Sequence, residues 1–132
     1  MFQLTPPTTP GGSWTETVIY SFTAANGDGG YPSASVVLGA NGVLYGTTQY
    51  GGIASSPCSY YGALGCGTVF QLTPPTTPGG VWTEAILHTF SGQNGDGSIP
   101  IAGLTLSPSG TLYGTTSGGG NANKGTVFSV TP

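Results

Sequence analysis

The sequence repeats itself with a period of about 68 residues. Residues 2–52 align without gaps on residues 70–120, and 30 of the 51 positions are identical. The run Phe2–Gly12 returns unchanged as Phe70–Gly80. In such architectures, one unit cannot bury its apolar side chains alone and packs them against its neighbours. Because two copies are fewer than the three or so usually needed, the sequence predicts contacts beyond this chain.

We therefore predict a single repeat domain over residues 1–132, made of two tandem units at about 2–69 and 70–132. A third copy of the Gly-Thr-Val-Phe strand lies at 125–132. The units differ most at Ile53–Cys66, where the second unit has only Asn121–Lys124. This difference indicates a long insertion in one loop of an otherwise regular pattern.

Charged residues are rare in this chain. They make up 4% of the sequence, against roughly 25% in ordinary soluble domains, and the net charge is -3. One basic residue cannot neutralise a phosphate backbone, so the composition argues against nucleic acid and anionic lipid as partners. No run of 18 apolar residues exists, so we expect no membrane insertion. The first residues also lack the pattern of a secretory signal peptide.

Each unit predicts four short strands, which we name by type. Type C covers Val69–Thr73, with copies at Met1–Thr5 and Val127–Thr131; type D covers Trp14–Phe22 and Trp82–Phe90; type A covers Ala34–Leu38 and Ala102–Leu106; type B covers Val43–Thr48 and Thr111–Thr116. Residues alternate along type D, and Asn-Gly or Ser-Gly turns separate A from B. The pattern predicts an all-β fold of β-propeller-like blades, each with four antiparallel strands, two per chain, completed by oligomerisation. A β-sandwich is the alternative, but it does not account for the repeat.

Type C occurs once more than the other types. In chain order the strands read C-D-A-B-C-D-A-B-C. Open sheet edges need cover, so we expect an A-B-C segment of one chain to be completed by a C-D segment of the next, head to tail. Ring closure to a trimer is favoured over a filament, because wedge-shaped blades tend to close. The predicted assembly strands carry Phe2, Leu4, Phe70, Leu72, Phe128 and Val130.

Both cysteines, Cys58 and Cys66, lie in the insertion. Eight residues apart in a Gly/Ser/Tyr-rich loop, they predict a disulfide that closes a hairpin, which requires an oxidising compartment. Two unreactive thiols are the alternative. The spacing fits no zinc pattern, and two further ligands would be missing.

The longest shared motifs resemble those of the GloVer repeats, which are bacterial extracellular tandem repeats. Leu-Tyr-Gly-Thr-Thr stands at Leu44–Thr48 and Leu112–Thr116, and Gly-Thr-Val-Phe-x-Leu/Val-Thr-Pro stands at Gly67–Pro74 and Gly125–Pro132. The resemblance implies exported or surface-anchored array proteins with no assigned catalytic residues. The same order of motifs is similar to NHL-type blades, which implies a propeller by analogy.

The tyrosines of the Leu-Tyr-Gly-Thr-Thr motif, Tyr45 and Tyr113, are expected in the core. The glycine that follows each one suggests close packing of the backbone against a neighbour.

Two Trp-Thr-Glu segments are the candidate ligand-binding residues. Trp14 and Glu16, like Trp82 and Glu84, are two positions apart on a strand, so each pair shares one face about 6–7 Å apart. An aromatic platform beside a carboxylate suits a sugar ring. The alternative is that each tryptophan packs the outer strand of its blade.

The remaining polar residues predict no catalytic site, no metal site and no cofactor. His88 is the single histidine, and no nucleophile-elbow motif accompanies it. Glu16 and Glu84 are repeat equivalents on different blades, so they do not predict a glycosidase pair. Asp28 and Asp96 lack the flanking ligands of an EF-hand and are expected to cap turns.

The function predicted from the sequence is a non-enzymatic, extracellular or cell-surface repeat module. It assembles with copies of itself through shared strands and has a structural role. The alternative is an oligomeric lectin that binds glycans at the two Trp/Glu pairs.

Overall fold

The computed structural model describes residues 1–52, 58–60 and 63–132, and in these residues the fold is all-β. The helical content of this described part is one 3-10 turn, η1 (Ala40–Gly42). No helix there has the length and apolar character needed to cross a membrane. The strands form several small antiparallel sheets, and none of the described sheets is closed.

The central sheet contains one strand of each predicted type. Its order is β10 (Thr83–Thr89), β9 (Thr68–Thr73), β5 (Leu44–Thr48) and β4 (Val37–Leu38), with all neighbours antiparallel. This is the order D-C-B-A of a four-stranded meander, and it takes strands from both sequence units. The type A strand is shorter than predicted, because pairing with β5 covers only two residues.

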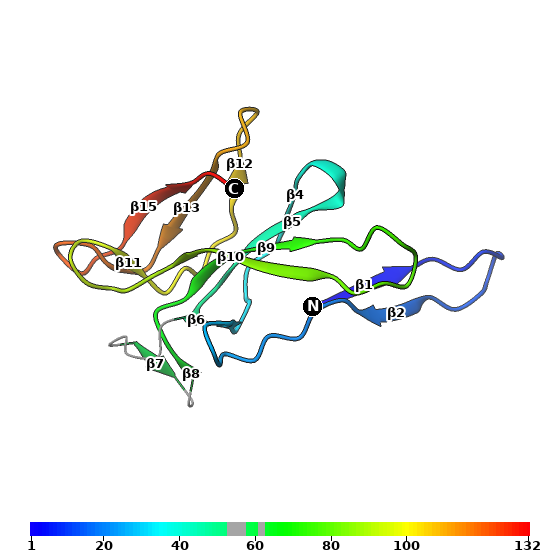
Figure 1. The fold of residues 1–132 in the computed structure, drawn as a ribbon, viewed down its shortest axis with the longest axis horizontal. Helices are drawn as coiled ribbons and strands as arrows, with labels where there is room; N and C mark the ends of the chain where they lie inside the picture. The colour runs from blue at the N-terminus through cyan, green and yellow to red at the C-terminus, as the bar shows by residue number, and fades with distance from the viewer. Residues whose placement is uncertain (53–57, 61–62) are drawn as a thin grey trace.

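Two further sheets contain incomplete sets of the same strand types. The C-terminal sheet joins β12 (Thr105–Leu106), β13 (Leu112–Thr116) and β15 (Thr126–Val130), which are types A, B and C. The N-terminal hairpin joins β1 (Phe2–Thr5) and β2 (Thr15–Val18), which are types C and D. Figure 1 shows this hairpin projecting from the body of the molecule. In β2, strand pairing ends at Val18, so the predicted strand to Phe22 was too long.

Short glycine-containing strands are the elements that the sequence pattern did not predict. They pair β3 (Gly29–Gly30) with β6 (Tyr50–Gly51), and β11 (Gly97–Ser98) with β14 (Gly118–Gly119). Two-residue strands rich in glycine offer no alternation of apolar and polar side chains, so the pattern could not indicate them.

Aromatic contacts recur at the same repeat positions. The rings of Phe22 and Phe70 lie 4.9 Å apart, and their equivalents Phe90 and Phe128 lie 5.0 Å apart, both edge to face. Phe70 and Phe90 are buried. In each case a phenylalanine that follows a type D strand packs on a type C strand of the next sheet. The repeat in sequence is therefore a repeat in packing.

Close packing between neighbouring strands explains the glycine of Leu-Tyr-Gly-Thr-Thr and the phenylalanine of Gly-Thr-Val-Phe. A Cβ added to Gly46 would lie 2.5 Å from Cζ of Phe70, and one added to Gly114 would lie 2.4 Å from Cζ of Phe128. The glycine in Leu-Tyr-Gly-Thr-Thr thus makes room for the phenylalanine in Gly-Thr-Val-Phe, as the expectation of close packing required. The hydroxyl groups of Thr48 and Thr68, both buried, form a hydrogen bond across β5 and β9, with 2.8 Å between the two Oγ1 atoms.

The predicted disulfide is present between Cys58 and Cys66. Its two cysteines flank the hairpin of β7 (Ser59–Tyr60) and β8 (Ala63–Leu64), since Cys58 directly precedes β7 and Cys66 follows β8. Residues 53–57 and 61–62 of the predicted insertion lie outside the described residues.

Candidate functional site

The central sheet is covered on the side that faces the C-terminal sheet. We call this side the forward face of a sheet, and in the central sheet it carries Tyr45 and Thr47 of β5, paired with Gln71 and Val69 of β9. Thr47 is 2% exposed and Val69 is 0% exposed. The hydroxyl of Thr47 donates to the Ala102 carbonyl at 3.1 Å, which ties this face to the following unit.

The forward face of the C-terminal sheet is open. Its residues are the repeat equivalents Tyr113, Thr115, Val127 and Ser129, and all four are exposed. Val127 is 80% exposed where Val69 is fully buried, and Tyr113 is 47% exposed. The expectation that Tyr113 lies in the core was wrong, because in this chain no described residues cover this face.

The outer edge of the C-terminal sheet is open as well. In the central sheet, β9 pairs with β5 on one side and with β10 on the other. In the C-terminal sheet, β15 pairs with β13, and no described strand takes the place of β10. The unpaired backbone groups of such an edge are a template for another strand.

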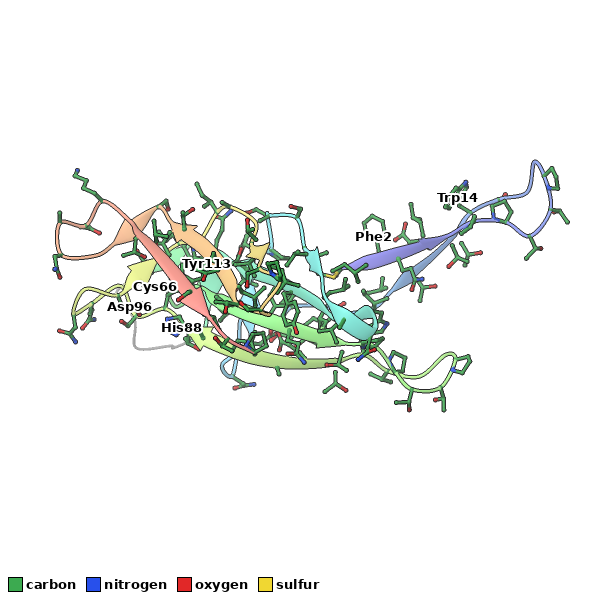
Figure 2. The ribbon with its side chains drawn as sticks, turned by 90° about the horizontal axis from the view of Figure 1, so that it is seen from above. Phe2, Trp14, Cys66, His88, Asp96 and Tyr113 are labelled. Atoms are coloured by element: carbon green, nitrogen blue, oxygen red, sulfur yellow. A yellow bond between two sulfur atoms is a disulfide. The ribbon has the colours of Figure 1, made fainter. Side chains whose placement is uncertain are left out.

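One face of the N-terminal hairpin carries three exposed apolar side chains and a glutamate. The register pairs Phe2 with Val18 and Leu4 with Glu16, so these four side chains share one face. Phe2 is 58%, Leu4 51% and Val18 61% exposed. Figure 2 shows the hairpin extended away from the remaining side chains, with Phe2 on it and Trp14 towards its tip.

A polar cluster links the segment after β2 to the central sheet. The Tyr20 hydroxyl donates to Oε2 of Glu84 on β10 at 2.8 Å. Asp28 accepts from the backbone and the hydroxyl of Thr23 through Oδ2. The other oxygens, Oδ1 of Asp28 and Oε1 of Glu84, are buried and accept no described hydrogen bond.

These contacts shift the pKa values of Glu84 and Tyr20. Burial raises the pKa of Glu84; the Asp28 carboxylate raises it further, while the hydrogen bond from Tyr20 opposes the shift. Burial and the Glu84 carboxylate also raise the pKa of the Tyr20 hydroxyl. The Glu84 carboxyl group therefore keeps its proton to a higher pH than an exposed glutamate does.

The second copy of this cluster is incomplete. His88 stands where the first copy has Tyr20, and its Nε2 lies 3.4 Å from Oδ1 of Asp96. Ser91 donates to Asp96 from its backbone and its hydroxyl at 2.7 and 2.9 Å, and the Gly97 amide donates at 2.8 Å. The described residues place no glutamate against this pair, because the repeat equivalent of Glu84 is Glu16, which lies exposed on the N-terminal hairpin.

The hydrogen bonds that Asp96 accepts lower its pKa. Partial burial pushes the pKa of Asp96 up, but the Ser91 backbone and hydroxyl, the Gly97 amide and His88 outweigh it, so the pKa lies below its ordinary value. The prediction that the aspartate caps a turn is confirmed, since both Ser91 and Gly97 belong to the loop that Asp96 closes.

The candidate ligand-binding residues are placed in two different environments. Trp14 is 62% exposed and Glu16 is exposed. Trp82 lines a groove of about 730 Å³ between the N-terminal hairpin and the Thr/Pro-rich connection after β9, whereas Glu84 is engaged by Tyr20. The pair at Trp82 is thus not a free tryptophan beside a free carboxylate, and ligand binding at either pair stays a prediction.

The residues of the predicted assembly strands differ in how deeply they are buried. Phe70 and Leu72 are buried in the central sheet and Phe128 and Val130 are partly buried, while Phe2 and Leu4 are exposed.

Within the described residues, no group of three or more His, Cys, Asp or Glu side chains is placed to hold a metal ion.

Sequence reasoning missed the contact between Tyr20, Glu84 and Asp28. A signal was present: a glutamate and an aspartate recur 12 residues apart in both units, at Glu16 with Asp28 and at Glu84 with Asp96. The pattern alone did not show that the glutamate of one unit meets the aspartate of the preceding unit.

Comparison with curated proteins and with solved structures found no match. A family comparison matches the Gloeobacter/Verrucomicrobia repeat over residues 1–132, the whole of the sequence, which confirms the resemblance that the motifs predicted. The propeller architecture stays a prediction. By its motifs, its packing and this match, the chain belongs to the Gloeobacter/Verrucomicrobia repeat family.

Proposed function

We propose that this protein is a non-enzymatic repeat module that assembles head to tail with copies of itself and serves a structural role. The observation that carries the proposal is the contrast between Val69 and Val127 on equivalent strands. One is fully buried by the next sheet, and the other is 80% exposed on the equivalent face of the C-terminal sheet. The surface that the chain covers once internally is displayed again.

A second copy of the chain can cover this surface with contacts that already exist inside one chain. Inside the chain, Leu104 and Phe128 pack against the buried cluster that contains Val69. The repeat equivalent of Leu104 in a second copy is Val36, which is 38% exposed and can make this contact. Such a contact joins different surfaces of two copies, so it either closes into a ring or propagates as a filament.

A closed, propeller-like trimer of six blades is the form we favour. The central sheet has the four-stranded antiparallel order of a blade, and two blade-like sheets follow each other in one chain. The disulfide between Cys58 and Cys66 supports an extracellular or cell-surface location, where such bonds persist. The low number of charges fits a chain whose surface is partly covered by neighbours.

Light scattering coupled to size-exclusion chromatography at micromolar concentration tests the proposal. One chain has a mass of 13.1 kDa, so a closed trimer gives about 39 kDa. Polydisperse material of much higher mass supports the filament form. A single species near 13 kDa at all concentrations contradicts self-assembly.

Carbohydrate binding is the second candidate function. The exposed Trp14 and the groove beside Trp82 favour it, because sugar rings stack on accessible aromatic faces. Glycan-array binding that is lost in Trp82→Ala or Trp14→Ala, at unchanged thermal stability, supports a lectin. Absence of binding to any glycan by the assembled wild-type protein contradicts it.

A further inference from the structure

The open edge of β15 and the hairpin β1–β2 identify which strand is exchanged at a junction between two copies. We infer that β2 of a second copy pairs with β15 as the fourth strand of the C-terminal sheet, displacing its own β1, and that Glu16 of that copy completes the cluster of His88 and Asp96. This inference rests on the proposed self-assembly and specifies its residues.

The first step is the equivalence of the strands. β2 and β10 are both type D, and Trp-Thr-Glu opens both segments. β15 and β9 are both type C. Since β10 pairs with β9 in the central sheet, β2 of a second copy offers β15 the partner that it lacks. Transferring the observed register of β9 and β10 pairs Glu16 with Val130 and Thr17 with Ser129.

The second step decides which type C strand gives way. β2 binds β1 through the same side that β10 uses to bind β9, since Phe2–Val18 and Phe70–Ile86 are equivalent pairs. Only one type C strand can occupy that side, so either β1 or β15 must leave.

β1 is the more weakly held of the two strands. All four residues of β1 are exposed, and its described strand partner is β2 in an isolated two-stranded hairpin, an element of marginal stability in water. β15 pairs with β13 over five residues, and its Phe128 packs on Phe90. Exchange therefore releases β1.

The third step is electrostatic. In the internal cluster, Glu84 of one unit meets Tyr20 and Asp28 of the preceding unit. At the junction, the repeat equivalents of Tyr20 and Asp28 are His88 and Asp96, and the equivalent of Glu84 is Glu16 of the second copy. The same arrangement therefore places Glu16 of the second copy against His88 and Asp96. Glu84 shares a face of β10 with Ile86, and Glu16 shares the equivalent face of β2 with Val18, so the side chain projects towards the preceding unit.

The junction differs from the internal contact at two positions, because His88 replaces Tyr20 and Ser91 replaces Thr23. The charged groups that face the His88 imidazole are Asp96 on its own chain and Glu16 of the second copy, and the Phe90 ring lies 4.6 Å from it. The imidazole thus offers Glu16 a ring N–H donor at the position where the Tyr20 hydroxyl donates to Glu84.

Disulfide trapping in the full chain tests the strand exchange. Residues directly opposite in an antiparallel pair have Cα atoms about 4.5–5.5 Å apart, within reach of a disulfide. Thr17→Cys with Ser129→Cys is therefore expected to give covalent oligomers under oxidising conditions. Thr15→Cys with Ser129→Cys is the control displaced by two residues, and it should cross-link far less.

Glu16→Gln, Glu84→Gln and His88→Tyr test the cluster through sedimentation equilibrium. Glu16→Gln is expected to raise the dissociation constant about tenfold or more, as for a charged hydrogen-bonded contact. The matched change Glu84→Gln alters an internal contact and should leave the dissociation constant within about twofold. His88→Tyr restores the internal combination of Tyr, Glu and Asp, so assembly should persist.

The outcomes separate this inference from the proposed function. If the wild-type chain assembles but the Thr17–Ser129 cross-link is absent, or Glu16→Gln behaves as wild type, or His88→Tyr abolishes assembly, the strand and cluster assignment is wrong while self-assembly stands. If the wild-type chain remains a single copy at every concentration, the proposed function itself is wrong.

Discussion

A pair of equivalent valines allows the buried and the open forward faces to be compared by one substitution. Val69→Ala removes two methyl carbons from a fully buried side chain. At about 0.8 kcal/mol for each carbon, the lost transfer free energy is about 1.6 kcal/mol, and the cavity adds on the order of 1 kcal/mol. We therefore expect Val69→Ala to lower the free energy of unfolding by about 2.5 kcal/mol, or Tm by roughly 10 °C for a chain of this size.

The same substitution at Val127 should depend on protein concentration. Val127 is 80% exposed in the single chain, so under dilute conditions Val127→Ala should change the free energy of unfolding by less than about 0.5 kcal/mol. In an assembly that buries Val127 as Val69 is buried, it should cost about the same 2.5 kcal/mol at each junction, which weakens association about 70-fold.

Thermal unfolding of both variants from below to above the association midpoint, with sedimentation equilibrium alongside, measures these effects. Equal, small effects of Val127→Ala at every concentration would refute the reasoning that the two faces are equivalent. A small effect of Val69→Ala would refute the packing argument itself.

Three further predictions concern a glycine, the disulfide and an aspartate. Gly114→Ala brings a Cβ within 2.4 Å of the Phe128 ring, so we expect a loss of about 1–3 kcal/mol in urea unfolding; wild-type stability would contradict the packing role of this glycine. Replacing both Cys58 and Cys66 with serine should lower the unfolding free energy by ~2.5 kcal/mol, because a short closed loop is released in the unfolded chain, and an unchanged urea midpoint would oppose this. The pKa of Asp96 is lowered by folding, so its carboxylate stabilises the fold above the ordinary aspartate pKa, and this contribution disappears as the pH falls through the folded value. Asp96→Asn should therefore destabilise the protein more at pH 6 than at pH 3; an equal effect at both values would count against the charge.

The repeat was enough to predict the strand types and their turns. The Asn41-Gly42 turn between types A and B adopts positive φ at both residues, as such a hairpin requires, and β5, β9 and β10 lie within about two residues of the predicted bounds. These elements were predictable because their residues recur in both units and their turn residues are specific. The alternation expected along type D is interrupted in β10 by a β-bulge between Ile86 and His88, which the pattern did not indicate.

Other features depend on contacts between distant segments and were hidden from the pattern. The pairing of Gly29–Gly30 with Tyr50–Gly51 uses backbone groups alone, so no side-chain period marks it. The exposure of Tyr113 could not be read from a motif identical to that around Tyr45, because the difference lies in what covers each sheet. The Tyr20–Glu84 contact spans 64 residues and needs the stacking of successive units.

The backbone amides of β15 provide the most direct test of head-to-tail assembly. One set of amides in Thr126–Val130 bonds to β13, and the alternate set points to the open edge. Residue-resolved hydrogen–deuterium exchange should show the first set protected at all concentrations. The account predicts that the second set gains protection as the concentration rises into the range where higher-mass species form. Exchange of the edge amides that stays fast and independent of concentration would contradict it.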